Sequence, residues 1–160
     1  MTQGLILIDH GSRRRQANLQ LACMARLVQQ QAGDAVYVRH AHMELAAPTL
    51  AEAFAACVHA GVEEIVIHPF FLAPGRHASE DIPRLAAEAA ASFPQIPYRV
   101  SAPLGVHPWL GRLVLERCGL TLRGPDFVSA APSPACPEDP AACTQPWCGP
   151  RAERAIAGEG

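Results

Sequence analysis

The sequence contains no lysine, and all 13 of its basic residues are arginines. Against 15 acidic residues they leave a formal net charge of -2, so the chain lacks the basic surplus that nucleic acid binding requires. A basic set made only of arginine is typical of a genome that favours arginine codons, or of a protein that binds carboxylates through planar guanidinium groups. The composition therefore predicts no nucleic acid partner and is compatible with a ligand that carries many carboxylates.

Long hydrophobic runs are also missing. No apolar stretch approaches the roughly 20 residues that a helix needs to cross a bilayer. The segment from Met1 to Gly4 has neither the basic region nor the cleavage site of a secretory leader. We therefore expect a cytoplasmic protein with no membrane partner. Its 160 residues and 49% hydrophobic content are enough for one compact core.

Short apolar segments alternate with segments of helical periodicity along most of the chain. Strands are predicted over residues 5–9, 35–42, 64–70 and 98–102, and helices over residues 13–31, 49–59, 79–92 and 107–118. Ser79 is the predicted N-cap of the third helix. This alternation predicts an α/β fold with a parallel sheet, right-handed crossovers and helices on both faces. Cys23 and Cys57 lie inside the helical pattern and are predicted to be small core residues.

The regular pattern stops at Gly124. Seven of the 15 prolines and three of the six cysteines come after that residue. Because proline interrupts both helices and sheets, such a segment does not form a regular element. We therefore expect one compact domain over residues 1–123 and an irregular tail rich in proline and cysteine over residues 124–160.

Two histidines follow strands of the predicted sheet. His10 comes directly after the strand at residues 5–9, and His77 ends the loop that follows the strand at residues 64–70. Both imidazoles are predicted at the carboxyl edge of the sheet, where open α/β folds bind ligands. One histidine in such a turn can equally cap or pack, but two that face one crevice indicate a metal site or a proton-transfer site.

A carboxylate, Glu44, follows the second predicted strand. We expect it beside His10, because sequential strands are commonly neighbours. Two imidazoles and one carboxylate leave coordination positions open, so His10, His77 and Glu44 are predicted to hold a divalent first-row metal. His42 shares the alternation of Glu44 and is expected to be half-exposed and at most to support the metal-binding residues. His40 has the same alternation, and the sequence alone does not separate it from the other two. The remaining histidines, predicted to be structural, are His59, His68 and His107.

Three motifs, in this order, resemble those of the sirohydrochlorin chelatases of the class II chelatase superfamily. They are LILIDHGSR at residues 5–13, MELAAP at residues 43–48 and PFFLAPGRHASEDIP at residues 69–83, and the resemblance extends over about residues 4–118. It implies a flavodoxin-like chelatase fold and insertion of cobalt or iron in cobalamin or sirohaem synthesis. It also implies that His10 and His77 are the active-site histidines and Glu44 the metal-facing carboxylate. One such unit resembles the short form of the family, which implies a homodimer.

The chemistry of metal insertion is consistent with these residues. Two pyrrole protons must leave the tetrapyrrole, and a neutral imidazole is a suitable acceptor near pH 7. Sirohydrochlorin carries many peripheral carboxylates, which arginines and the N-terminus of a helix bind well. The candidate residues for binding these groups are Ser12, Arg13, Arg14 and Arg76. Arg15 is expected to lie on a solvated helix face.

The cysteines near the C-terminus offer a second candidate site. Cys118, Cys136, Cys143 and Cys148 supply four thiols, the number that an iron-sulfur cluster or a structural zinc requires. Some members of the family that the sequence resembles carry cysteine-rich C-terminal segments, including iron-sulfur versions. The resemblance therefore makes an iron-sulfur cluster the first prediction for these cysteines. The spacing lacks the tight Cys-x2-Cys pattern, and a disordered extension with unused thiols remains an alternative.

Two other functions fit parts of the sequence. A metal-delivery protein without catalysis would bind metal tightly through the cysteine tail and would bind no tetrapyrrole. A flavin or nucleotide binder is disfavoured, because the loop at residues 10–13 has too few glycines to cradle a phosphate. Within the chelatase interpretation, imidazole and carboxylate ligands accept cobalt, iron and nickel alike, so the sequence does not select the metal.

Overall fold

The structure is a computed structural model that describes residues 2–73 and 75–120, with the backbone alone for residues 76–79. The chain divides into two compact units, Met1–Leu104 and Gly105–Gly160, and residues 105–120 are the described part of the second. The predicted domain boundary at residue 123 and the predicted tail lie outside the described residues. The candidate site at His10 and Glu44 belongs to the first unit.

The first unit contains a parallel sheet of four strands in the order β2-β1-β3-β4. The strands are β1 (Gln3–Asp9), β2 (Val36–His42), β3 (Glu64–Pro69) and β4 (Tyr98–Val100). The predicted strands are confirmed, and β1 and β2 are neighbours as expected. The fourth strand is shorter than predicted and ends at Val100 rather than residue 102.

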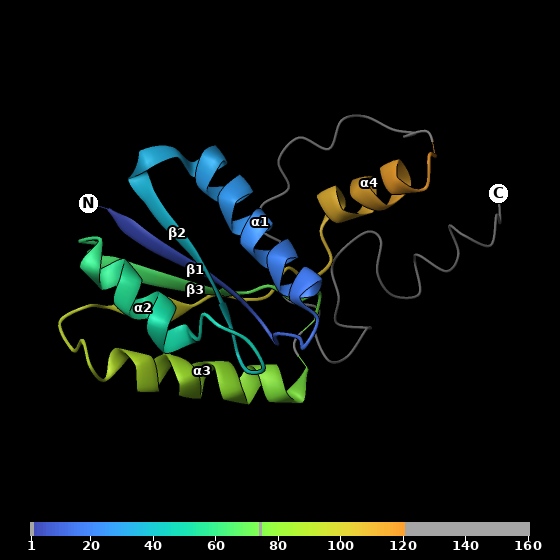
Figure 1. The fold of residues 1–160 in the computed structure, drawn as a ribbon. Helices are drawn as coiled ribbons and strands as arrows, with labels where there is room; N and C mark the ends of the chain where they lie inside the picture. Colours follow the sequence, from blue (N-terminus) through green and yellow to red (C-terminus); the bar gives the residue numbers. More distant parts are fainter. Residues whose placement is uncertain (1, 74, 121–160) are drawn as a thin grey trace, which may run out of the picture. The chain divides into compact units, whose positions relative to one another are not determined.

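Helices cover both faces of this sheet, as predicted (Figure 1). Helix α1 (Arg15–Ala32) packs on one face, and α2 (Leu50–His59) and α3 (Arg76–Ala90) pack on the other. The short 3-10 helix η1 (Gly33–Ala35) joins α1 to β2. The larger core lies under α2 and α3, and its main side chains are Ile6, Ile8, Phe54, Ile65, Ile67 and Ile82. The smaller core under α1 is formed chiefly by Leu7, Leu21, Ala25 and Val38.

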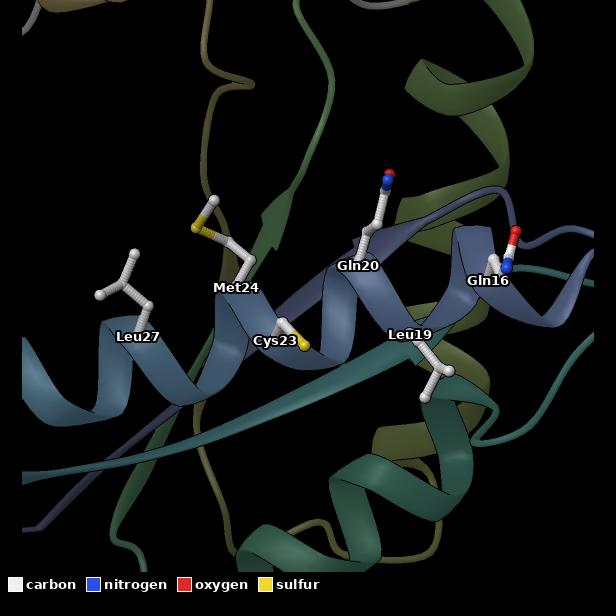
Figure 2. A pocket seen from close by; sticks show the side chains of 6 residues that line it. All are labelled: Gln16, Leu19, Gln20, Cys23, Met24 and Leu27. Atoms are coloured by element: carbon white, nitrogen blue, oxygen red, sulfur yellow. The ribbon is translucent and has the colours of Figure 1, made fainter.

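Helix α1 buries one short row of side chains. Leu21, Ala22 and Ala25 form its buried row, whereas Cys23 is exposed, so its prediction as a core residue was wrong. At 100° per residue, Cys23 falls on the outer side of that row. It lies there in a shallow, mostly apolar groove, and Figure 2 shows the six residues that line it, Gln16, Leu19, Gln20, Cys23, Met24 and Leu27. Cys57, by contrast, is fully buried in the larger core, as predicted.

Helix α3 begins earlier than the sequence indicated. Its N-cap is Gly75, whose backbone is extended, and the predicted N-cap Ser79 lies inside the helix. The acidic pair after Ser79 resembled a first turn, but the backbone is already helical from Arg76. Pro83 therefore lies well inside the helix, where its missing N–H leaves the carbonyl four residues earlier without its usual partner.

A capping box begins α2 and leads to a first prediction. The hydroxyl of Thr49 accepts a hydrogen bond from the Glu52 amide (3.3 Å), and the Glu52 carboxylate accepts one from the Thr49 amide (2.7 Å). Thr49→Ala is expected to lower the free energy of unfolding by about 1 kcal/mol, measured by urea denaturation. Thr49→Ser keeps the acceptor and is the control; an equal loss in both variants would contradict the capping role.

The same capping box predicts how the stability of the protein changes with pH. The hydrogen bonds from Thr49 lower the pKa of Glu52 below its ordinary value of 4.5. The stabilisation that the ionised Glu52 carboxylate supplies is therefore fully present above pH 4.5. It is lost as the pH falls through the lowered pKa of Glu52. The difference in stability between the wild type and Thr49→Ala should accordingly shrink in acid.

The described part of the second unit is one helix, α4 (Pro108–Arg117). His107 is its N-cap, and its Nδ1 accepts a hydrogen bond from the Trp109 amide (3.2 Å). The structural role predicted for His107 is thus confirmed. Among residues 2–73 and 75–120, no helix is long and apolar enough to cross a membrane.

Candidate functional site

The backbones of two predicted metal-binding residues, His10 and Glu44, are neighbours just beyond the ends of β1 and β2. The strand pairing continues past both strands, because the amide of Met43 donates to the Asp9 carbonyl (2.8 Å) and the amide of Glu44 to the His10 carbonyl (3.1 Å). His10 and Glu44 are therefore adjacent at the carboxyl edge of the sheet, and both are exposed. The pairing shows that the backbones of these two residues are neighbours, and a shared metal site between their side chains stays a prediction.

Gly11 makes this close approach possible. Its φ angle is +81°, in the left-handed region that favours glycine. A Cβ atom at this position would lie 2.0 Å from the carbonyl oxygen of Glu44 and 3.0 Å from the Cβ of His42. The loop after His10 can therefore lie against the Glu44 backbone only because residue 11 has no side chain.

The ring of His10 packs against Phe71, two residues after the end of β3. Its centroid lies 4.7 Å from that of Phe71, with the planes tilted by 53°. The amide of Phe70 donates to the Ile8 carbonyl (2.7 Å), so the loop leading towards His77 leaves the sheet beside β1. His77 is the second residue of α3. The structure describes only the backbone of His77 and Arg76, not their side chains. Among the described side chains, no group of three histidine, cysteine or acidic residues could hold a metal ion.

Asp9 and His42 form a buried pair behind these residues. The His42 Nδ1 atom lies 2.5 Å from the Asp9 Oδ1 atom, and the imidazole is completely buried. The expectation of a half-exposed His42 was therefore wrong, because the ring is enclosed beside Asp9 at the strand end. The sequence pattern alone indicates no role for Asp9.

The predicted substrate-binding residues lie where the first loop enters α1. Asn18 fixes this loop, since its side chain accepts from the Ser12 amide (2.9 Å) and donates to the Ser12 carbonyl (2.8 Å). The Ser12 hydroxyl accepts from the Arg14 amide (3.0 Å), so it also shapes the turn. Arg13 and Arg14 are exposed and form no ion pair among the described residues, which leaves both guanidinium groups available to an anion.

A hollow of about 360 Å³ lies beside this loop. Arg13 and Arg15 line it together with His40 and His42, and Arg15 is exposed as expected. Burial lowers the pKa of His40 below its ordinary value, helped by the neighbouring His42 and Arg39. His40 is consequently neutral near pH 7. The structure thus separates His40, which lines this hollow, from Glu44, which lies beside His10.

Comparison with known proteins shows the family of this chain. The CbiX family model matches residues 4–119, which is most of the chain. This chain belongs to the CbiX family. The match spans all three motifs on which the predicted resemblance rested, and it includes both His10 and Glu44.

Curated relatives of this CbiX chain are named as chelatases for sirohydrochlorin. The chloroplastic sirohydrochlorin ferrochelatase of Arabidopsis thaliana is 46% identical over 114 residues, covering 71% of this chain and 50% of that protein. The sirohydrochlorin cobaltochelatase of Methanococcoides burtonii is 33% identical, covering 71% of this chain and 92% of that protein. The chain therefore spans about half the length of the plant relative and almost all of the archaeal one.

Solved structures give the same fold for the CbiX unit. The sirohydrochlorin chelatase SirB from Bacillus subtilis subspecies spizizenii in complex with cobalt has a TM-score of 0.67 and 29% identity, covering 74% of this chain and 50% of that chain. A CbiX protein from Marinobacter aquaeolei, described as a putative cobalamin biosynthesis protein, has a TM-score of 0.61 and 27% identity, covering 73% and 94%. The predicted chelatase fold is thereby confirmed for this chain.

The described residues include one of the four cysteines predicted to hold a cluster. Cys118 is exposed at the C-cap of α4. Cys136, Cys143 and Cys148 lie outside the described residues, so the predicted iron-sulfur site stays a prediction.

The three described cysteines differ in exposure. Burial raises the pKa of Cys57 to about 11, whereas Cys23 and Cys118 are exposed. Because the thiolate is the reactive form, Cys57 is expected to resist alkylation at pH 8 until the protein unfolds. Peptide mass mapping after a short iodoacetamide pulse should find Cys23 labelled and Cys57 unlabelled. Equal labelling of the two in the folded protein would contradict the burial of Cys57.

His68 has a structural role, as predicted. Its Nδ1 atom lies 2.7 Å from the Ser101 hydroxyl oxygen, which ties the end of β3 to the segment after β4. Burial lowers the pKa of His68, partly offset by a hydrogen bond to the Ala102 backbone. The ring is therefore a neutral bridge between neighbouring strand ends.

Proposed function

We propose that this chain is a sirohydrochlorin chelatase that inserts Co²⁺ or Fe²⁺ into the tetrapyrrole in cobalamin or sirohaem biosynthesis. The observation that supports the proposal is the hydrogen bond between the Glu44 amide and the His10 carbonyl, which makes the backbones of these two exposed residues neighbours at the carboxyl edge. The CbiX family assignment and the names of the relatives support it.

The reaction exchanges two pyrrole protons for one divalent ion. His10, Glu44 and His77 are proposed to hold the incoming metal and to take up these protons, with no further division of roles. A neutral imidazole accepts a proton near pH 7, and a carboxylate shares the charge of a partly dehydrated ion. The exposure of His10 and Glu44 leaves room for a large, flat substrate to approach the metal.

Binding of the substrate's carboxylates is assigned to the first loop and the start of α3. The guanidinium groups of Arg13 and Arg14, which form no ion pair within residues 2–73 and 75–120, are suited to this role, with Arg76 and the Ser12 hydroxyl as further candidates. Because these charges lie beside the candidate metal site, they would orient the ring as well as bind it.

The assembly, the location and the C-terminal cofactor are finer parts of the proposal. We expect a cytoplasmic homodimer in which Cys118, Cys136, Cys143 and Cys148 bind an iron-sulfur cluster. Truncation after Arg123 removes three of these thiols, so the truncated protein is expected to fold but to lack the cluster's visible absorption. A cluster that survives the truncation would contradict the assignment to the tail.

The experiment that tests the proposal is anaerobic insertion of Co²⁺ and Fe²⁺ into sirohydrochlorin, followed by the change in visible absorption. Catalysis above the spontaneous rate is the expected result, and the relative rates would compare the two metals. No acceleration with either ion, combined with tight metal binding that disappears on truncation after Arg123, would favour the metal-delivery function instead.

A further inference from the structure

The contact between Asp9 and His42 joins the two strands that carry the candidate ligands. The two residues are register partners at the ends of β1 and β2, so their side chains lie on the same face of the sheet. The Nδ1 to Oδ1 distance is 2.5 Å, and the His42 ring is completely buried while the Asp9 side chain is 26% exposed. Each residue lies within two positions of a predicted metal-binding residue, but its side chain is used in the contact between strands.

The same oxygen of Asp9 also holds the backbone beyond His10. Oδ1 accepts a hydrogen bond from the Gly11 amide (2.9 Å), which turns the chain directly after His10. The Asp9 carboxylate therefore contacts both the Gly11 amide, one residue after His10, and the His42 imidazole on the neighbouring strand. Removing either bond would loosen the turn at His10, which the backbone hydrogen bonds to Met43 and Glu44 would then hold alone.

Only one nitrogen of the His42 ring forms a hydrogen bond among the described residues. Its Nε2 atom is buried and has no hydrogen-bond partner there. A buried polar atom without a partner costs stability, so the position is not optimised for folding alone. The contact that accounts for a histidine here is the one between Nδ1 and Asp9.

We propose that Asp9 and His42 are a positioning pair that sets the separation of His10 and Glu44, and thereby the affinity of the site for the divalent ion. The inference rests on the proposed function, because it takes His10 and Glu44 as the residues that hold the metal. Outer residues that orient metal ligands typically affect affinity or activity by about 10- to 100-fold.

Two substitutions of His42 test which ring atom matters. An asparagine amide can occupy the place of Nδ1 and keep the bond to Asp9, whereas a glutamine amide reaches the place of Nε2 and loses it. Asp9→Ala removes both bonds of the carboxylate. The matched control is His59→Gln, because His59 is exposed at the C-terminal end of α2 and pairs with none of these residues.

The readouts are the dissociation constant for Co²⁺ without tetrapyrrole, and the KM values for Co²⁺ and sirohydrochlorin during insertion. His42→Gln and Asp9→Ala are expected to weaken Co²⁺ binding by about 10-fold or more, with His42→Asn and His59→Gln close to the wild type. The KM for Co²⁺ should rise while that for sirohydrochlorin changes little. Thermal unfolding of each variant identifies losses that come from a damaged fold.

The outcomes separate this inference from the proposed function. A wild type that inserts metal normally, together with folded His42→Gln and Asp9→Ala variants of unchanged Co²⁺ affinity, would overturn the positioning role. Equal losses in folded His42→Asn and His42→Gln would overturn it too, because the ring rather than its bond to Asp9 would then matter. A wild type that fails to insert metal would overturn the function, while the Co²⁺ affinities would still decide the role of the pair.

Discussion

His10→Ala is expected to slow metal insertion by about 100-fold or more, the range typical of removing a group that transfers a proton in catalysis. The side chain is exposed, and its ring contact in the described structure is with Phe71. The free energy of unfolding should therefore change by less than about 1 kcal/mol. Initial rates of Co²⁺ insertion, together with urea unfolding curves, measure both quantities.

His59→Ala is the matched control for this prediction. It removes a second exposed histidine, which ends α2 and is therefore remote from the carboxyl ends of the strands. Its insertion rate should equal that of the wild type. A folded His10→Ala protein that inserts metal at a near-normal rate would exclude His10 from the reaction.

Gly11→Ala should be among the most destabilising single substitutions in the sheet unit. A left-handed conformation costs an alanine about 1–3 kcal/mol, and forcing a methyl group into a filled space costs about 1–3 kcal/mol more. The new Cβ atom would lie 2.0 Å from the Glu44 carbonyl oxygen, so the Glu44 backbone has to move. We expect a loss of roughly 2–6 kcal/mol in the free energy of unfolding and weaker Co²⁺ binding in whatever protein still folds.

Gly33→Ala separates the two causes. Gly33 has a similar φ angle of +67°, but no other atom lies within 4 Å of the position its Cβ would take. This variant should therefore show the conformational cost alone, about 1–3 kcal/mol, with unchanged Co²⁺ affinity. Equal losses of stability and metal binding in both variants would contradict the role of the Gly11 and Glu44 contact.

The order of the elements and the layers was predictable because it depends on local periodicity. Buried parallel strands give short apolar runs, and β1 and β3 have that pattern. The start of α3 was not predictable in the same way, because Ser79 followed by acidic residues is also a valid cap signal. Exposure of Cys23 was missed because its neighbours are apolar, although the buried row of α1 passes through Ala22 and Ala25.

The candidate site was only partly predictable. That the backbones of His10 and Glu44 are neighbours could be inferred, since it requires only that β1 and β2 be adjacent strands. The contact between Asp9 and His42 depends on the register of strands that are 33 residues apart, which the sequence pattern does not determine. The need for glycine at residue 11 likewise comes from a carbonyl oxygen on another strand.

The central claim is that the divalent ion binds at the carboxyl edge between His10 and Glu44. Crystals of the full chain soaked anaerobically in Co²⁺ would test it through anomalous scattering at the cobalt edge. The account predicts an anomalous peak within coordination distance of His10 and Glu44, with His77 as a further ligand. A peak beside His40 and His42, with none between His10 and Glu44, would contradict it.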